Sequence, residues 1–107
     1  MIANTPVPPY YTVIFTSLRT EIEDGYHNMA DKMMTLAKQQ EGFLGIEFAR
    51  EEVGITVSYW KDLESIKKWK ANTDHSLAQA KGRKDWYSAY KTRIAKVERD
   101  YGFEKYT

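Results

Sequence analysis

A chain of 107 residues is long enough for one domain with a small hydrophobic core, and its 42% hydrophobic and 29% charged content is that of a globular protein. Sixteen basic against fifteen acidic residues leave a net charge of +1, which argues against nucleic-acid binding because such proteins usually carry a clear basic excess. The absence of cysteine excludes disulfides, thiolate catalysis and thiolate metal sites. The chain has no signal-peptide pattern and no membrane-spanning apolar run, so we expect no membrane contact and take the cytoplasm as the default location.

The aromatic content is high for so short a chain. Aromatic residues make up 14% of it, with eight tyrosines and three tryptophans. A small domain can bury only some of these side chains, so we expect the others to line a pocket or an interface.

The first half of the chain predicts a tail, a strand and a helix. Residues 1–9 are expected to be an extended tail, because three prolines remove backbone donors, and residues 10–107 are expected to form a single domain. Tyr10–Leu18 predicts a strand, since it is β-branched and aromatic without a breaker. Asp24–Gln40 predicts a helix, because its apolar residues recur at helical spacing.

The middle of the chain predicts a β-hairpin. Phe43–Arg50 and Ile55–Trp60 have the composition of strands and flank the residues EEVG. Gly54 is expected to supply the positive φ of a tight turn between them.

The last third predicts a divided helix and a long strand. Asp62 is expected to cap a helix that Asn72 or Thr73 interrupts and recaps, with two further turns stopping at Gly82. A period-2 pattern over Ala89–Tyr101 predicts the final strand.

The resulting β-α-β-β-α-β order is that of an α+β, ferredoxin-like domain, with an antiparallel sheet covered by helices on one face. Val13, Ile14 and Phe15 are consecutive, so the first strand offers apolar groups to both faces of the sheet. Two helices cover only one face, and an isolated chain would leave an apolar patch in water. We therefore expect a homodimer packed face to face, with Trp86 and Tyr90 near the contact.

Three segments resemble the dimeric α/β-barrel family that includes antibiotic biosynthesis monooxygenases and heme-degrading monooxygenases. They are EGFLGIEF after the first helix, ITVSYWKDLESIKKW from strand to helix, and DHSLAQAKGRKDWY. The resemblance covers about residues 10–101. It implies a ferredoxin-like fold, a dimeric α/β barrel and a monooxygenase-like activity on a small molecule.

The heme-degrading branch of this family uses an asparagine on the first strand, a tryptophan on the helix after the hairpin and a histidine about ten residues later. Trp69 matches the tryptophan, but Gln79 stands at the histidine position and Thr16 or Ser17 at the asparagine position. His75 lies one helical turn before Gln79. The first expectation is therefore a protein without a cofactor, and heme binding is the alternative.

The candidate site combines one histidine with aromatic side chains. His75 is interpreted as a catalytic general base, because neutral imidazole can accept a proton near neutral pH. Trp69, Trp60, Phe15 and Gln79 are expected to line the binding cavity of a small aromatic ligand, with no metal. The alternative is that both tryptophans are core residues and that His75 caps a helix turn or binds a backbone carbonyl.

Three functions are compatible with these features. The first is a monooxygenase-like protein that oxidises a small aromatic or quinol compound without a cofactor. The second is a heme-binding or heme-degrading monooxygenase. The third is a non-catalytic dimeric module that binds a small molecule.

Overall fold

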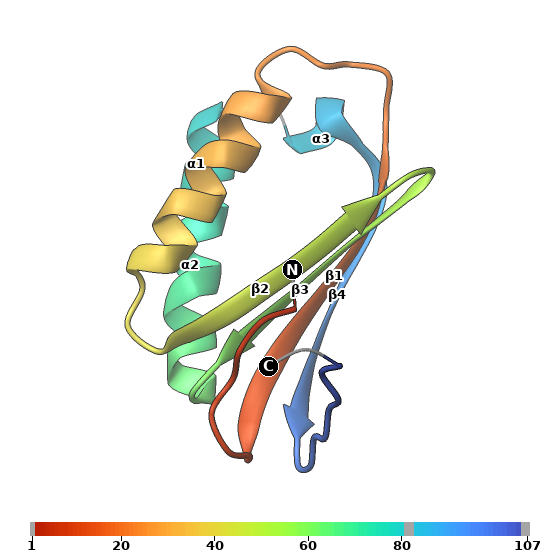
Figure 1. The fold of residues 1–107 in the computed structure, drawn as a ribbon. Helices are drawn as coiled ribbons and strands as arrows, with labels where there is room; N and C mark the ends of the chain where they lie inside the picture. The colour runs from red at the N-terminus through yellow and green to blue at the C-terminus, as the bar shows by residue number, and fades with distance from the viewer. Residues whose placement is uncertain (1, 81–82, 106–107) are drawn as a thin grey trace.

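A four-stranded antiparallel sheet carries two long helices on one of its faces in the computed structural model of the chain (Figure 1). The structure describes residues 2–80 and 83–105, without the side chains of residues 75–80, 83 and 84. In chain order the elements are β1 (Tyr10–Arg19), α1 (Tyr26–Gln39), β2 (Phe43–Arg50), β3 (Val53–Trp60), α2 (Leu63–Ala80), α3 (Arg83–Trp86) and β4 (Tyr87–Val97). The strands lie in the order β2-β3-β1-β4, which confirms the predicted ferredoxin-like α+β fold.

Strand pairing arranges the side chains of the helix-covered face in four rows across the sheet. Residues directly opposite each other in antiparallel strands point to the same face, so each row follows from the register. In the order β2, β3, β1, β4 the first row is Phe43, Trp60, Tyr11 and Lys96, the second Ile46, Ser58, Val13 and Ile94, the third Phe48, Thr56, Phe15 and Thr92, and the fourth Arg50, Gly54, Ser17 and Tyr90.

Helix α2 begins with the predicted cap. The Asp62 carboxylate accepts hydrogen bonds from the backbone N–H of Ser65 at 2.8 Å and from its hydroxyl at 2.7 Å. These two hydrogen bonds lower the pKa of Asp62, because they favour its charged form. The cap holds the start of α2 directly after β3, where the helix can pack on the first row.

The predicted break in this helix is wrong, because α2 continues through Asn72 and Thr73. The Thr73 hydroxyl donates to the carbonyl of Lys70 at 2.9 Å within the helix, so it does not recap a new one. The Asn72 amide donates to the side chain of Gln40 at 3.2 Å and links α2 to the end of α1. The predicted stop at Gly82 lies outside the described residues.

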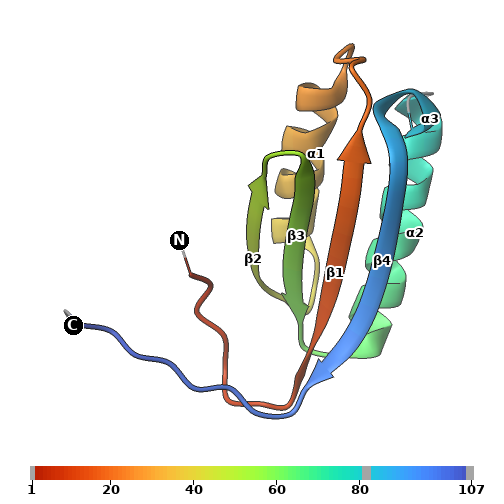
Figure 2. The same ribbon diagram turned by 90° about the vertical axis from the view of Figure 1, so that its right-hand side faces the viewer.

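The other element boundaries differ by a few residues. The final strand runs from Tyr87 to Val97 instead of Ala89 to Tyr101, and the short helix α3 precedes it. The last ladder pairing with β1 is Tyr10 with Val97, so the strand ends where its partner begins. Residues 98–105 leave the sheet without regular structure (Figure 2).

The predicted role of Gly54 is also wrong. Gly54 lies inside β3, and among the described residues the glycines with positive φ are Gly25 and Gly42. A Cβ atom at position 54 would overlap the guanidinium of Arg50, which lies across this glycine on the helix-covered face. Glycine is therefore needed here for the close approach of a side chain and not for a turn.

The opposite face of the sheet carries no helix (Figure 2). It presents apolar residues to solvent, and Leu18, Val53 and Ile55 are each more than two-fifths exposed. The N-terminal tail is held on the same face, where Glu47 accepts hydrogen bonds from the backbone N–H of Ala3 at 2.9 Å and from the Tyr59 hydroxyl at 2.6 Å. The uncovered face thus carries exposed apolar side chains as well as the Glu47 carboxylate that binds the tail.

Substitution of Gly42 by alanine should destabilise the fold. Gly42 has φ +86°, and an added Cβ would lie 2.7 Å from the Cβ of the buried Ser65. Left-handed backbone and overpacking together should lower the free energy of unfolding by about 2–4 kcal/mol. Urea unfolding followed by tryptophan fluorescence measures this. Gly102→Ala is the control, since nothing lies within 4 Å of its added Cβ; equal losses for both variants would contradict the explanation.

Candidate functional site

In the middle rows of the helix-covered face, apolar side chains on the edge strands β2 and β4 remain accessible to solvent. In the second and third rows Ser58 is buried, whereas Phe48 is 69% exposed and Ile94 is 53% exposed. Val13 and Phe15, on the central strand β1, are only partly buried. Interior side chains are normally close-packed, so these apolar residues indicate a surface that the helices do not fill. We call rows two to four of this face the helix-side surface.

Trp60 closes one end of the helix-side surface. Its side chain is fully buried, and its indole N–H donates to the Ser58 hydroxyl at 2.9 Å. Trp69 of α2 stacks on it with ring centroids 5.7 Å apart, and Phe43 meets it edge to face at 5.5 Å. Trp60 therefore packs as a core residue, while the partly buried Trp69 still has surface to offer.

A second aromatic cluster closes the other end, where α1 begins and β4 starts. Phe15 lies 5.4 Å from Tyr90 and 5.7 Å from Tyr87, measured between ring centroids. Tyr26 of α1 contacts Tyr87 at 6.0 Å and Trp86 at 5.9 Å. The cluster joins β1, the start of α1 and the start of β4 at one corner of the sheet.

The structure therefore separates Phe15 from the two tryptophans with which the sequence grouped it. Phe15 lies opposite Thr56, four residues before Trp60 on β3, which corresponds to about 13 Å along the strand. Trp86 is only 3% exposed, and its indole donates to the carbonyl of Asp24 at 2.8 Å. It packs inside the chain and so has little side-chain surface to offer a second copy, while its predicted place near a dimer contact stays untested.

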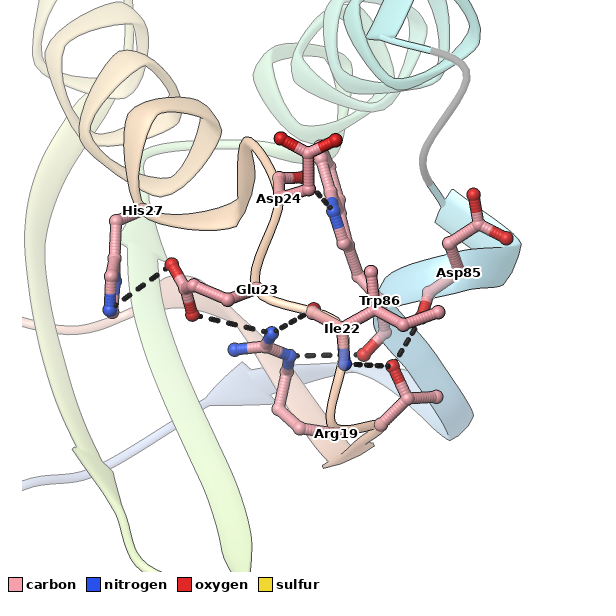
Figure 3. A network of polar contacts seen from close by, with 8 residues as sticks. Arg19, Ile22, Glu23, Asp24, His27, Asp85 and Trp86 are labelled. Carbon is pink, nitrogen blue, oxygen red and sulfur yellow. Dashed lines mark hydrogen bonds and ion pairs between the residues drawn. The ribbon is translucent and has the colours of Figure 1, made fainter.

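Arg19 holds this corner together, and its bonding capacity is largely used (Figure 3). Its guanidinium lies 3.3 Å from the centroid of the Tyr26 ring and donates to the carbonyls of Trp86 and Ile22. It also lies 3.8 Å from the Glu23 carboxylate. These contacts are those of a structural arginine.

His27 follows Glu23 by one helical turn, and its imidazole lies 3.4 Å from that carboxylate. Its side chain is 79% exposed. Figure 3 shows His27 beside Glu23, which also contacts Arg19.

Arg50 is the functional candidate that the sequence analysis missed. It ends β2, reaches across Gly54 and donates to the side chain and the carbonyl of the buried Ser17 on β1. The signal was present in the alternation of β2, which puts Ile46, Phe48 and Arg50 on one face. Glu51 and Glu52 follow Arg50 in the sequence, and a run of charged residues usually indicates a solvated surface. Arg50 therefore did not stand out as a binding residue.

Tyr87, at the start of β4, belongs to the second aromatic cluster. Burial raises the pKa of Tyr87, and the nearby Tyr26, with which it forms a hydrogen bond, raises it further. The guanidinium groups of Arg50 and Arg19 oppose this effect without cancelling it. Tyr87 is therefore a neutral hydrogen-bond donor at physiological pH and not a base.

The side chains of His75 and Gln79 lie outside the described residues, so their predicted roles are untested. The backbone of α2 is continuous there, and His75 is not at the start of a separate helix. Position 75 lies six residues beyond Trp69, which is about 120° around the helix axis.

A metal site and a membrane-spanning helix are both absent from the part of the chain that the structure describes. No group of three or more histidine, aspartate or glutamate side chains within it could hold a metal ion. None of its helices is long and apolar enough to cross a membrane.

The antibiotic biosynthesis monooxygenase family has a sequence model that matches residues 9–81, and those residues run from the start of β1 to the end of α2. The chain belongs to this family. It is also 46% identical over 108 residues to the uncharacterized protein YqjZ of Bacillus subtilis (strain 168), across 99% of this chain and 95% of that protein.

Solved structures with the same fold include two of particular interest. SnoaB, a cofactor-independent oxygenase from Streptomyces nogalater, superposes with a TM-score of 0.69 at 11% identity, over 87% of this chain and 97% of that one. PA3566 from Pseudomonas aeruginosa superposes with a TM-score of 0.66 at 15% identity, over 90% and 99%. At such low identities these similarities establish the fold alone.

Tyr87 should remain protonated in the folded protein up to strongly alkaline pH. Tyr87→Phe should therefore leave the rise in phenolate absorbance between neutral pH and about pH 11 unchanged, because a buried phenol resists ionisation. In denaturant the same variant should lose one-eighth of the total absorbance change, since the chain has eight tyrosines. A loss of that size in the folded protein would show that Tyr87 ionises readily.

Proposed function

We propose that this protein binds a small aromatic or quinol compound on the helix-side surface and oxidises it with O₂ without a bound cofactor. The observation that carries the proposal is the accessible apolar surface between two aromatic clusters, on the face of the sheet where helices would normally exclude solvent. A flat aromatic ligand could fill this surface and stack on Trp69 or Phe15. Membership of the monooxygenase family and the shared fold with a cofactor-independent oxygenase support the same reaction class.

The proposed reaction begins when a base removes a proton from a phenol or from a methylene beside an aromatic carbonyl. The electron-rich anion transfers one electron to O₂, and the resulting radicals combine to form a C–O bond. With a methylene substrate, loss of water from the hydroperoxide leaves a carbonyl. One oxygen atom stays in the product, the other leaves in water, and the broken C–H bonds supply all the electrons, so no external reductant is needed.

His75 is the proposed base, because neutral imidazole accepts a proton near physiological pH and α2 also carries Trp69. Trp69, Phe15 and Gln79 are proposed to bind the ligand, and Trp60 acts from behind by fixing the ring of Trp69. Tyr87 is not the base in this proposal, since burial keeps its hydroxyl protonated.

Anthrone should be oxidised by the purified protein with uptake of O₂ and no added cofactor. His75→Ala should lower the rate by about 10²–10⁴-fold, the usual contribution of a general base, with little change in binding. Trp69→Ala should mainly weaken binding, because it removes a stacking surface. An oxygen electrode, corrected for anthrone oxidation without protein, measures the rate.

His27→Ala is the matched control, since this histidine is 79% exposed and contacts Glu23, and its loss should not affect the rate. Unchanged O₂ uptake in His75→Ala would exclude His75 as the base. Addition of heme provides a second check, because a Soret band that disappears in His75→Ala would favour heme binding over a cofactor-free reaction. Binding of anthrone without oxidation would favour a non-catalytic module.

We further propose that two copies pack through their uncovered faces as a homodimer. Leu18, Val53 and Ile55 expose apolar area there, which a second identical face would bury. Tyr101 and Phe103, in the segment that follows β4, are 91% and 86% exposed and are available to contact a second copy.

Ile55→Arg should therefore dissociate the dimer, because it introduces a charge among the exposed apolar residues of the uncovered face. Light scattering at micromolar concentration should show twice the mass of one chain for the unmodified protein and the mass of one chain for the variant. Phe48→Arg is the control, since Phe48 is exposed on the other face of the sheet and this change should leave the dimer intact. A monomeric unmodified protein would contradict the proposal.

A further inference from the structure

We propose that Arg50, held by Ser17 in the row that also carries Tyr90, forms an anion site that selects aromatic ligands carrying an ionised oxygen. The inference deepens the proposed function and rests on it: the substrate class becomes phenols and enols that are bound as their anions.

The position of Arg50 is set by the sheet. Arg50, Gly54 and Ser17 occupy one row across β2, β3 and β1, so the guanidinium lies flat along the helix-covered face. Its Nη1 donates to the Ser17 carbonyl at 3.5 Å and its Nη2 donates to the Ser17 hydroxyl. Ser17 is only 2% exposed, so the guanidinium is anchored to a fixed point of the central strand.

Arg50 retains hydrogen-bonding capacity. A guanidinium has five N–H donors, and the two hydrogen bonds to Ser17 leave others available. No carboxylate among the described side chains forms an ion pair with it. Its charge is therefore not neutralised by the surrounding described residues, whereas Arg19, the other cation near Tyr87, already contacts Glu23 and two carbonyls.

The surroundings of Arg50 suit an aromatic anion better than a small inorganic one. Tyr90, in the same row, is 46% exposed, and its ring lies 5.4 Å from that of Phe15 and 5.8 Å from that of Tyr87. Phe48 precedes Arg50 by two residues on the same face of β2 and is exposed. A ligand ring could contact these side chains while its oxygen accepts hydrogen bonds from Arg50.

The proposed site also has a chemical consequence. A nearby guanidinium stabilises a phenolate or enolate relative to its neutral form and so lowers the pKa of the bound ligand. The anion is the form that gives an electron to O₂, and Arg50 would increase its population at physiological pH. The raised pKa of Tyr87 keeps its hydroxyl neutral, so Tyr87 contributes no negative charge that would repel the anion.

4-Nitrophenol tests the inference directly, because only its phenolate is yellow. Added protein should increase the colour at a pH below the pKa of the free phenol, since the opposite charge lowers the pKa of the bound ligand by about one unit or more. Arg50→Gln should abolish this change and weaken binding of the phenolate about 10- to 100-fold, as expected for loss of a charge-assisted hydrogen bond. Equilibrium dialysis of 4-nitrophenol gives its affinity for the unmodified protein and for the variant.

Two further variants test whether the colour change depends on the position of the Arg50 guanidinium or only on the net charge of the protein. Gly54→Ala keeps the arginine but forces its guanidinium aside, so it should also reduce the colour change. Arg99→Gln removes the same charge from the exposed C-terminal segment and should leave the colour change intact. Equal effects of Arg50→Gln and Arg99→Gln would mean that net charge alone is responsible, which would overturn the inference.

4-Nitroanisole, which cannot ionise, distinguishes this inference from the proposed function. The inference is supported if 4-nitroanisole binds equally to the unmodified protein and to Arg50→Gln while 4-nitrophenolate does not. If both compounds bind and Arg50→Gln affects neither, the anion site is wrong but the aromatic binding surface stands. If neither compound binds to the unmodified protein, both proposals fail.

Discussion

The packing of Trp60 fixes the relation between the sheet and its helices. Its indole is fully buried, bonded to the Ser58 hydroxyl and enclosed by Trp69 and Phe43. Truncating such a side chain typically costs about 3–5 kcal/mol, a large part of the stability of a small domain. Because this contact lies in the first row of the sheet, it holds α2 at one end and leaves the later rows partly uncovered. The solvent-accessible apolar side chains in those rows are what a ligand could cover.

Arg19 and Arg50 lie on the same face of the sheet, but their hydrogen-bond partners give them different roles. Arg19 is surrounded by an aromatic ring, two carbonyls and a carboxylate, and it stabilises the corner between β1 and α1. Arg50 is fixed by a single buried serine and keeps donors for another acceptor.

The sequence predicted the order of the elements and the Asp62 cap, because periodicity and capping depend on neighbouring residues alone. It did not predict that α2 passes through Thr73, since the link from Asn72 to Gln40 joins residues far apart in the chain. The residues of the candidate site were harder to predict from the sequence than the fold. Strand pairing separates Phe15 from Trp60 and brings Arg50 to Ser17, and register cannot be deduced from composition.

The position of β1 in the sheet has a consequence for synthesis of the protein. β1 is the first strand of the chain and pairs with β3 on one side and with β4, the last strand, on the other. While the chain emerges from the ribosome, one edge of β1 therefore has no partner until residues 87–97 have appeared. The sheet is therefore complete only after β4 has emerged, and the unpaired edge of the apolar strand β1 is open to wrong pairing until then.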